Sequence, residues 1–230
     1  MDVVILAAGF GTRLRPHTER TPKPLLPVQG RPILDWIIGS LPPADRLIVV
    51  VNYLAEQIEG YLRTQSHVPV EKCVAVRQAV PRGTGDALMS CRAECRSETV
   101  MVLNGDDLYG RDDLRRLAGC GAGLLAHPVD APEKFGIVFP RADGTLEKIV
   151  EKPPLTGTQL ANIGAYLFPR DVFDRELPLS PRGEYEITDA VSGTAARQPF
   201  RVLPATFWLP IGTVEAWEAA QSADLSAVGG

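Results

Sequence analysis

The sequence predicts an α/β fold in which a mostly parallel sheet is flanked by helices and continues into a mixed-sheet extension. The first observation is that short apolar runs alternate with segments of helical periodicity up to residue 103. Strands that alternate with helices of this length are typical of a parallel sheet covered on both faces. The second observation is the pair Asp143-Gly144 between two apolar runs, which predicts a hairpin and therefore antiparallel strands.

Each element is assigned from its local pattern. Residues 31–41 carry apolar side chains at helical spacing, and residues 54–63 repeat that pattern. Ligands of open α/β sheets lie beyond the carboxyl ends of strands, so the loops after residues 7, 77 and 103 are expected to meet at one site. The predicted strands are 2–7, 46–51, 70–77, 99–103, 135–139, 145–150, 162–168 and 200–204, and the predicted helices are 31–41, 54–63, 84–93, 184–196 and 213–225.

Length, charge and composition narrow the class of protein. The 230 residues fit a single domain, 1–230, and the net charge of −4 comes without the basic stripe that nucleic acid requires. No apolar segment approaches a membrane span, and the N-terminus lacks the basic start of a secretory signal, so we expect a cytoplasmic protein that binds neither nucleic acid nor membrane. Cys91 and Cys95 have no matching Cys/His pair, which favours reduced structural thiols over a zinc site.

The loop after the first strand carries the strongest functional signal. Residues 6–14 read LAAGFGTRL, in which small side chains let backbone N–H groups approach an anion and Arg13 can pair with phosphate oxygens. A helix after this loop would add its positive end. The loop lacks the ending of a Walker A motif, and Leu14 stands at the third glycine of the dinucleotide fingerprint. A tight strand-to-helix turn is the alternative interpretation.

Lys23 lies close to this loop in a stiff stretch of backbone. Pro22 and Pro24 flank it, and each proline fixes its own φ and restricts the preceding residue. The rigid frame favours a phosphate contact for the ammonium, whereas an ordinary surface lysine is the alternative.

These two motifs, LAAGxGTRLxP at residues 6–16 and Pro22-Lys23-Pro24, resemble the signature of the sugar nucleotidyltransferases. Further blocks of that family recur in order at 77–87, 103–107, 135–138, 149–153 and 162–166, so the resemblance spans most of the chain. It implies a Rossmann-like fold of the nucleotide-diphospho-sugar transferase type, with a nucleotide-binding half of about 1–110 and a sugar-binding half of about 111–230. It also implies Mg²⁺ as cofactor, and a nucleoside triphosphate and a sugar 1-phosphate as partners. The oligomeric state, a homo-oligomer included, stays open.

The resemblance also assigns roles to residues. Gln78 has an amide that both donates and accepts, which suits uracil or thymine and therefore favours UTP or dTTP. Thr84 is expected to cap a helix whatever its role in binding. The alternatives are a turn residue for Asp106, exposed charges for Glu151 and Lys152, and a helix start for Glu184. The implied catalytic residues are Arg13, Lys23 and Asp106, with Asp106 as metal ligand; the nucleotide-binding residues are Leu6, Ala7, Ala8, Gly9, Gly11, Thr12, Arg13, Gln78, Gly83 and Thr84; and the sugar-phosphate-binding residues are Asn104, Gly136, Glu151, Lys152, Asn162, Gly164 and Glu184.

One position departs from the family. Its segment Trp-x-Asp-x-Gly-Thr carries a second Mg²⁺ ligand, but here residues 208–213 read WLPIGT and Pro210 offers no side-chain oxygen. We expect weaker metal binding unless Asp107 or Glu184 compensates. Pro210 therefore keeps open a catalytically weak paralogue that binds nucleotide sugars or regulates a partner. A cytidylyltransferase that acts on a phosphorylated alcohol shares the glycine loop and is a further alternative, less favoured because residues 151–152 and 162–164 resemble a sugar site.

The histidines give no general base. His17, His67 and His127 are isolated in the sequence, with no paired carboxylate motif. A sugar 1-phosphate is already anionic and nucleophilic, so catalysis would depend on positioning and charge stabilisation.

Overall fold

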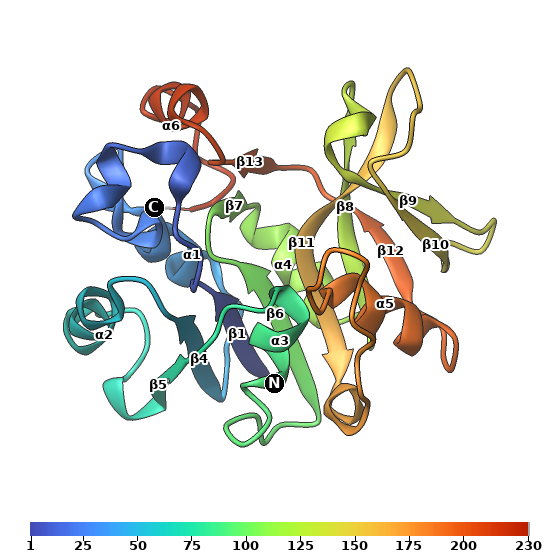
Figure 1. Cartoon of the computed structure of the whole chain (residues 1–230), viewed down its shortest axis with the longest axis horizontal. Helices are drawn as coiled ribbons and strands as arrows, with labels where there is room; N and C mark the ends of the chain where they lie inside the picture. The colour runs from blue at the N-terminus through green and yellow to red at the C-terminus, as the bar shows by residue number, and fades with distance from the viewer. Residues whose placement is uncertain (230) are drawn as a thin grey trace.

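The computed structural model describes residues 1–229 and shows a central nine-stranded sheet with helices on both faces (Figure 1). The strands are β1 (Asp2–Leu6), β2 (Pro27–Val28), β3 (Arg31–Pro32), β4 (Arg46–Val51), β5 (Cys73–Arg77), β6 (Thr99–Asn104), β7 (Asp107–Tyr109), β8 (Gly123–Val129), β9 (Gly136–Pro140), β10 (Leu146–Glu151), β11 (Gln159–Pro169), β12 (Arg201–Pro204) and β13 (Trp208–Pro210). The α-helices are α1 (Ile33–Ser40), α2 (Ala55–Thr64), α3 (Thr84–Met89), α4 (Arg111–Ala118), α5 (Ile187–Ala195) and α6 (Val214–Ala220).

The first half of the chain forms the parallel part of the sheet. Strands β6, β1, β4 and β5 lie side by side in that order, and all three pairings are parallel. From β1 the chain builds outward to β4 and β5, and it then crosses back to place β6 on the other side of β1. The strand order therefore reverses between β1 and β6, the point in open α/β sheets where ligands bind.

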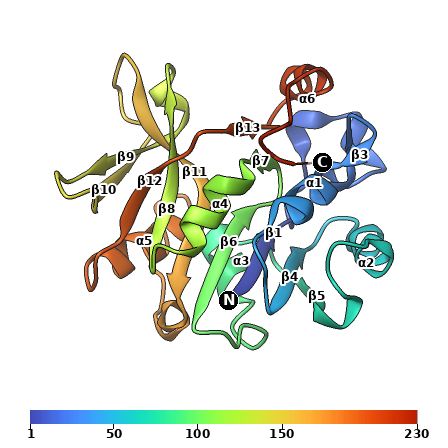
Figure 2. The same ribbon diagram turned by 180° about the vertical axis from the view of Figure 1, so that it is seen from behind.

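The second half adds the antiparallel extension. β11 pairs antiparallel with β6 and also with β8 and β9, and β12 joins β8 in parallel. The hairpin predicted around Asp143-Gly144 is present, as β9 and β10 are antiparallel neighbours. Figure 2 shows β8, β9, β10 and β12 gathered on the side of the molecule away from β4 and β5. The predicted combination of a mostly parallel sheet with a mixed extension is confirmed.

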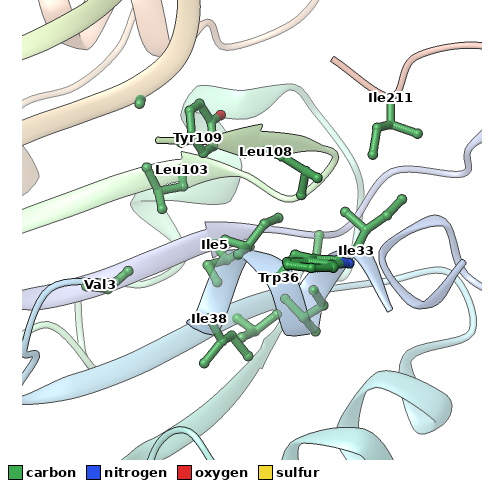
Figure 3. Packing of buried hydrophobic residues seen from close by; sticks show 14 of the residues in the cluster. Val3, Ile5, Ile33, Trp36, Ile38, Leu103, Leu108, Tyr109 and Ile211 are labelled. Carbon is green, nitrogen blue, oxygen red and sulfur yellow. The ribbon is translucent and has the colours of Figure 1, made fainter. Parts of the chain in front are cut away.

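Alternation along β1 divides the core into two layers. Val3 and Ile5 point toward α1, α2 and α4, whereas Val4 points toward α3 and α5, because successive side chains of a strand leave opposite faces. Figure 3 shows the first layer, where Ile5 lies beside Trp36 of α1 and Leu103 of β6. All five of these residues are at most 7% exposed, so the strand that carries the glycine loop is held on both faces.

Several elements differ from the sequence-based expectations. The predicted strand 70–77 begins with a 3₁₀ turn, Val70–Lys72, and only 73–77 pair in the sheet. The predicted helix 84–93 ends at Met89, and the predicted helix 184–196 begins at Ile187. The elements α4, β7, β8 and β13 were not predicted. In α4 the sequence RDDLRRLA has too few apolar residues to stand out, although Leu114 and Leu117 anchor it to the core.

The C-terminal helix α6 packs against the segment around β2. Trp217 Nε1 donates to the carbonyl of Pro27 at 2.8 Å, and Gln29 Nε2 donates to the carbonyl of Ala220 at 3.1 Å. The last helix thereby braces the segment that leads from the glycine loop and Lys23 into α1 (Figure 1). Among residues 1–229, none of the helices has the length and apolar character needed to cross a membrane.

Candidate active site

A cavity of about 460 Å³ lies at the carboxyl ends of β1, β5 and β6. The expected convergence of the loops after residues 7, 77 and 103 is therefore confirmed. Its lining combines apolar, polar and acidic side chains: Leu6, Ala7, Ala8, Gly9, Phe10, Lys23, Pro24, Gln78, Pro81, Gly83, Thr84, Ala87, Asn104, Gly105, Asp106, Glu184 and Glu186.

The glycine loop presents free backbone donors to this cavity. Ala7 N–H still donates to the carbonyl of Val50 in the sheet, at 2.9 Å. Within the part of the chain that the structure describes, the N–H groups of residues 8–11 donate to no other residue. Successive unpaired N–H groups next to a strand end form an anion-binding concavity, so this loop is suited to phosphate oxygens.

The loop is followed by a single 3₁₀ turn, Thr12–Leu14, and no α-helix. The positive helix end that the sequence suggested is therefore reduced to one short turn. Gly11 adopts φ +62°, and a Cβ there would press on Thr18, whose Oγ1 donates to the Gly11 carbonyl at 2.8 Å. Gly11, Thr12 and Arg13 do not line the cavity. Instead the exposed Arg13 guanidinium lies beside Gly212, where a Cβ would stand 3.6 Å from Nη2.

Lys23 and Asp106 form an ion pair inside the cavity. Lys23 begins a 3₁₀ turn (Lys23–Leu25) and is only 7% exposed, and its Nζ donates to Asp106 Oδ2. Asp106 follows β6, 83 positions later in the chain, and its side chain is about one-third exposed. The proline-framed lysine therefore holds a buried positive charge beside the glycine loop, paired with the carboxylate of Asp106 in the loop after β6.

Gln78 also lines the cavity and is buried. Its Nε2 donates to Asp86 Oδ2 at 2.8 Å and lies 3.3 Å from the carbonyl of Gly83. Gly83 adopts φ +102°, and a Cβ there would overlap the carbonyl of Tyr185. The need for glycine at this position thus comes from the close approach of the 184–186 backbone.

The expected helix cap by Thr84 is wrong. The residue before α3 is Gly83, and no side chain caps that helix. The Thr84 hydroxyl instead accepts from the backbone N–H of Ile187 at 3.1 Å, at the start of α5. A tertiary contact has replaced the local capping interaction, and it ties the segment carrying Glu184 to the floor of the cavity.

Asn104 links the cavity to the second group of predicted residues. It lines the cavity at the end of β6, and Gly164 of β11 packs directly against its amide. Gly164 adopts φ +73°, and a Cβ there would overlap Asn104 Nδ2. Only glycine therefore allows β11 to approach the end of β6 this closely.

The other predicted sugar-side residues lie on the extension, outside the cavity lining. Gly136 pairs with Glu151 across the β9–β10 hairpin, where a Cβ at 136 would stand 3.0 Å from Glu151 Oε2. Lys152 has φ +45°, and its Nζ is 4.0 Å from Glu151 Oε1. Asn162 donates to the Tyr166 hydroxyl at 2.8 Å. Glu184, predicted among the sugar-phosphate residues, lies instead with Gln78 and Gly83 in the cavity.

The segment that carries Pro210 runs directly beside Asp106. Pro210 of β13 pairs with Asp107 of β7, and the N–H of Ile211 donates to the Asp106 carbonyl at 3.1 Å. Asp107 is 7% exposed, lies outside the cavity lining and accepts from Asn104 Nδ2 at 3.2 Å. Burial, together with the nearby Asp106 carboxylate, raises the pKa of Asp107 to about 8. Asp107 is thus poorly placed to supply the carboxylate that position 210 lacks.

One histidine has a carboxylate partner after all. His67 Nε2 lies 3.2 Å from Asp35 Oδ1, so the expectation that all three histidines are isolated is wrong for this residue. The pair is also contacted by the Tyr61 hydroxyl on α2 and lies outside the cavity lining. The cavity itself contains no histidine among the residues that the structure describes.

Sequence reasoning missed Phe10 and Glu186 as cavity residues. Phe10 is 46% exposed although aromatic, and its ring centre lies 5.7 Å from that of Tyr53. A lone aromatic inside a glycine loop was the available signal for Phe10. Glu186 precedes α5 and pairs with Arg182 at 2.8 Å. Its place in the cavity depends on the tertiary approach of residues 184–186 to Gly83, which local sequence does not encode.

Comparison with known proteins identifies the family. The family model described as nucleotidyl transferase matches residues 2–227. The bifunctional protein GlmU of Methanocaldococcus jannaschii is 31% identical over 216 residues, which cover 92% of this chain and 51% of that protein. The mannose-1-phosphate guanylyltransferase of Mycobacterium tuberculosis is 30% identical over 227 residues, which cover 94% of this chain and 62% of the enzyme. The chain spans about half the length of the GlmU relatives that it matches.

Solved structures share the fold over nearly the whole chain. An apo UDP-glucose pyrophosphorylase superimposes with a TM-score of 0.84 at 23% identity, covering 98% of each chain. A putative glucose-1-phosphate thymidylyltransferase from Bacillus anthracis does so with a TM-score of 0.80 at 26% identity, covering 96% of this chain and 94% of the other. Their agreement confirms the predicted nucleotide-diphospho-sugar transferase fold, and with the sequence matches it shows that this chain belongs to the nucleotidyl transferase family.

Proposed function

We propose that the protein transfers a nucleotidyl group from UTP or dTTP to a sugar 1-phosphate and releases pyrophosphate. The observation that carries this proposal is one cavity, lined by the unpaired N–H segment of residues 8–10, by the Lys23–Asp106 pair and by Gln78. A site for a nucleoside triphosphate needs N–H donors for the phosphate oxygens, a cation, a carboxylate and a polar side chain for the base, and this cavity has all four. The relatives include a mannose-1-phosphate guanylyltransferase, so the choice of UTP or dTTP as donor is part of this proposal.

The reaction would proceed by direct displacement. An oxygen of the sugar 1-phosphate attacks the α-phosphorus, the bond from that phosphorus to the bridging oxygen breaks, and pyrophosphate leaves with the electron pair. The glycine loop would hold the triphosphate, and Arg13 would approach it from the side of Gly212. Lys23 and Lys152 would orient the sugar phosphate. No proton transfer from the nucleophile is needed, consistent with the absence of histidine from the described cavity.

The donor set is compatible with Mg²⁺ bound together with the nucleotide. Mg²⁺ is held by one or two carboxylates plus substrate phosphates and waters, and Asp106 supplies one partly exposed carboxylate at the cavity wall. No cluster of three or more Asp, Glu, His or Cys residues forms a protein-only cage among residues 1–229. When bound, the metal would neutralise charge on the phosphates, with Asp106 as its protein ligand.

The sugar side would be built from the extension. Asn104 and Gly164 join the cavity to β11, and Gly136, Glu151 and Asn162 lie beyond that junction. We propose that the sugar lies along this route, with its phosphate toward Lys23. We propose that the half of about 1–110 binds mainly the nucleotide and the half of about 111–230 mainly the sugar, with Glu184 and Glu186 reaching the shared cavity. We also propose that the enzyme is cytoplasmic.

Pro210 supports a second candidate, a nucleotide-sugar sensor with little or no turnover. The discriminating measurement is pyrophosphate release with Mg²⁺, testing UTP, dTTP, GTP, CTP and ATP against a panel of sugar 1-phosphates. Release with one pair would establish the transferase, and we expect Lys23→Ala and Asp106→Asn to lower that rate by on the order of 10²-fold or more. Nucleotide binding without release from any pair would favour the sensor. Near-normal rates in both variants would contradict the assigned roles.

A further inference from the structure

The backbone of Gln78 is anchored through both its N–H and its carbonyl to residues 51 and 52 at the end of β4. Its N–H donates to the carbonyl of Val51 at the end of β4, at 2.9 Å. Its carbonyl accepts from Asn52 Nδ2 at 2.6 Å, and the residue is 5% exposed. With the main chain fixed and the side chain enclosed, the remaining freedom is rotation of the terminal amide.

The surroundings of the amide fix that rotation. Nε2 lies 2.8 Å from Asp86 Oδ2 and 3.3 Å from the carbonyl of Gly83. A carboxylate and a carbonyl are acceptors only, so the group facing them has to be the NH₂. Turning the amide over would bring its oxygen against two other oxygens. The Asp86 side chain is itself held, because Arg82 Nη2 donates to its other oxygen at 2.8 Å.

The carbonyl oxygen of the same amide is left for a ligand. Gln78 Oε1 accepts no hydrogen bond from any residue in 1–229. The fully buried polar atoms that lack a partner do not include this oxygen, so it is not fully buried. It therefore retains access to solvent, and the side chain lines the cavity. The Gln78 amide therefore offers a ligand its acceptor Oε1, because its donor Nε2 is already bonded to Asp86.

We infer that Asp86 is a positioning residue that restricts the site to bases carrying a ring N–H toward Gln78, namely uracil, thymine and guanine. Cytosine and adenine present a ring nitrogen with a lone pair at that edge, which would face the lone pairs of Oε1. A buried group that is left facing another acceptor loses its hydrogen bond and its hydration together. This inference rests on the proposed function for the identity of the ligand as a nucleotide, and it adds the residue that determines which bases the site accepts.

UTP and CTP provide the sharpest test, because the two bases differ in this edge and hardly in size. Dissociation constants would be measured by titration calorimetry with Mg²⁺ for the wild type, Asp86→Asn and Arg82→Ala. Polar recognition of this kind discriminates by about 10²-fold or more, so we expect at least that preference for UTP in the wild type. In Asp86→Asn the new amide can turn its NH₂ toward Gln78, which releases the Gln78 amide to rotate. We expect the preference to fall at least about tenfold, mainly because CTP binds more tightly.

Arg82→Ala is the matched control, since it removes the other partner of Asp86 and leaves the acceptor in place. It should keep the preference for UTP within about threefold of the wild type, as expected for an exposed pair. Thermal unfolding would verify that each variant folds, and Asp86→Ala, which also frees the amide, provides a second route if Asp86→Asn does not.

The outcomes separate this inference from the proposed function. An unchanged UTP preference in folded Asp86 variants, or equal binding of UTP and CTP by the wild type, would overturn the inference. A UTP preference that depends on Asp86 but comes without pyrophosphate release would support the inference about Asp86 and overturn only the proposed transferase activity. A wild type that binds no nucleotide would overturn both.

Discussion

The ion pair between Lys23 and Asp106 should respond asymmetrically to the loss of either partner. The Lys23 side chain is 9% exposed and that of Asp106 is 35% exposed. Asp106→Ala would leave an ammonium almost fully buried without its counter-charge, for which about 3–5 kcal/mol is typical. Lys23→Met would leave a carboxylate that water reaches, so we expect a loss of only about 1–2 kcal/mol in the free energy of unfolding. For a chain of this length these losses correspond to Tm decreases of roughly 6–20 °C and 2–8 °C respectively.

The measurement is urea and thermal unfolding of both variants and of the double variant, without metal or nucleotide. We expect the double variant to be more stable than Asp106→Ala, because a methionine of similar length then occupies the lysine site without charge. A reversed order of the single variants, or losses that simply add in the double variant, would refute the conclusion that the two side chains are each other's main partners.

Four further substitutions test the glycines and position 210. Gly164→Ala should cost about 2–3 kcal/mol and displace Asn104, visible as a lower Tm with weakened sugar-phosphate binding, since the new Cβ combines a positive φ with an overlap. Gly83→Ala should destabilise the fold by a similar amount or more, whereas Gly9→Ala, with no atom within 4 Å of its Cβ, should keep the wild-type Tm and alter only triphosphate binding. Pro210→Asp should lower the Mg²⁺ concentration needed for half-maximal turnover, and an unchanged requirement would show that this position does not reach the metal.

The position of the cavity was predictable because it follows from the strand order and from the loops that end the strands. The loop from Leu6 to Gly9 is consecutive in the chain, and the rule that ligands lie at the carboxyl ends of parallel strands brings Gln78 and Asp106 to the same edge. The strand boundaries did not need to be accurate, since the residues that matter lie just beyond the strands.

Other parts depend on contacts between distant segments, which local patterns do not encode. The pairing of Lys23 with Asp106 joins positions 83 apart, and the approach of Gly164 to Asn104 requires β11 to lie beside β6. Thr84 shows the same limit in a single residue. Its sequence context fits a helix cap, but the chain brings Ile187 to its hydroxyl, and the tertiary bond prevails.

The charges around Asp106 also predict that Mg²⁺ would bind together with the nucleotide and not before it. The Asp106 carboxylate is already paired with Lys23, Asp107 is buried and accepts a hydrogen bond from Asn104, and position 210 carries no side-chain oxygen. Free Mg²⁺ therefore meets an Asp106 carboxylate whose charge is offset by Lys23, and Glu184 is the remaining unpaired acid of the described cavity. We expect calorimetry to show no saturable binding of Mg²⁺ alone below the millimolar range. With nucleotide present, the phosphates supply the missing ligands and accept the Lys23 ammonium, so Mg²⁺ should bind more tightly by a factor of ten or more, on the order seen for coupled ligands. Asp106→Asn should abolish that gain while the nucleotide alone still binds. Tight binding of Mg²⁺ to the nucleotide-free protein would contradict this reasoning, and its loss in Glu184→Gln would identify Glu184, the unpaired acid of the described cavity, as the replacement ligand.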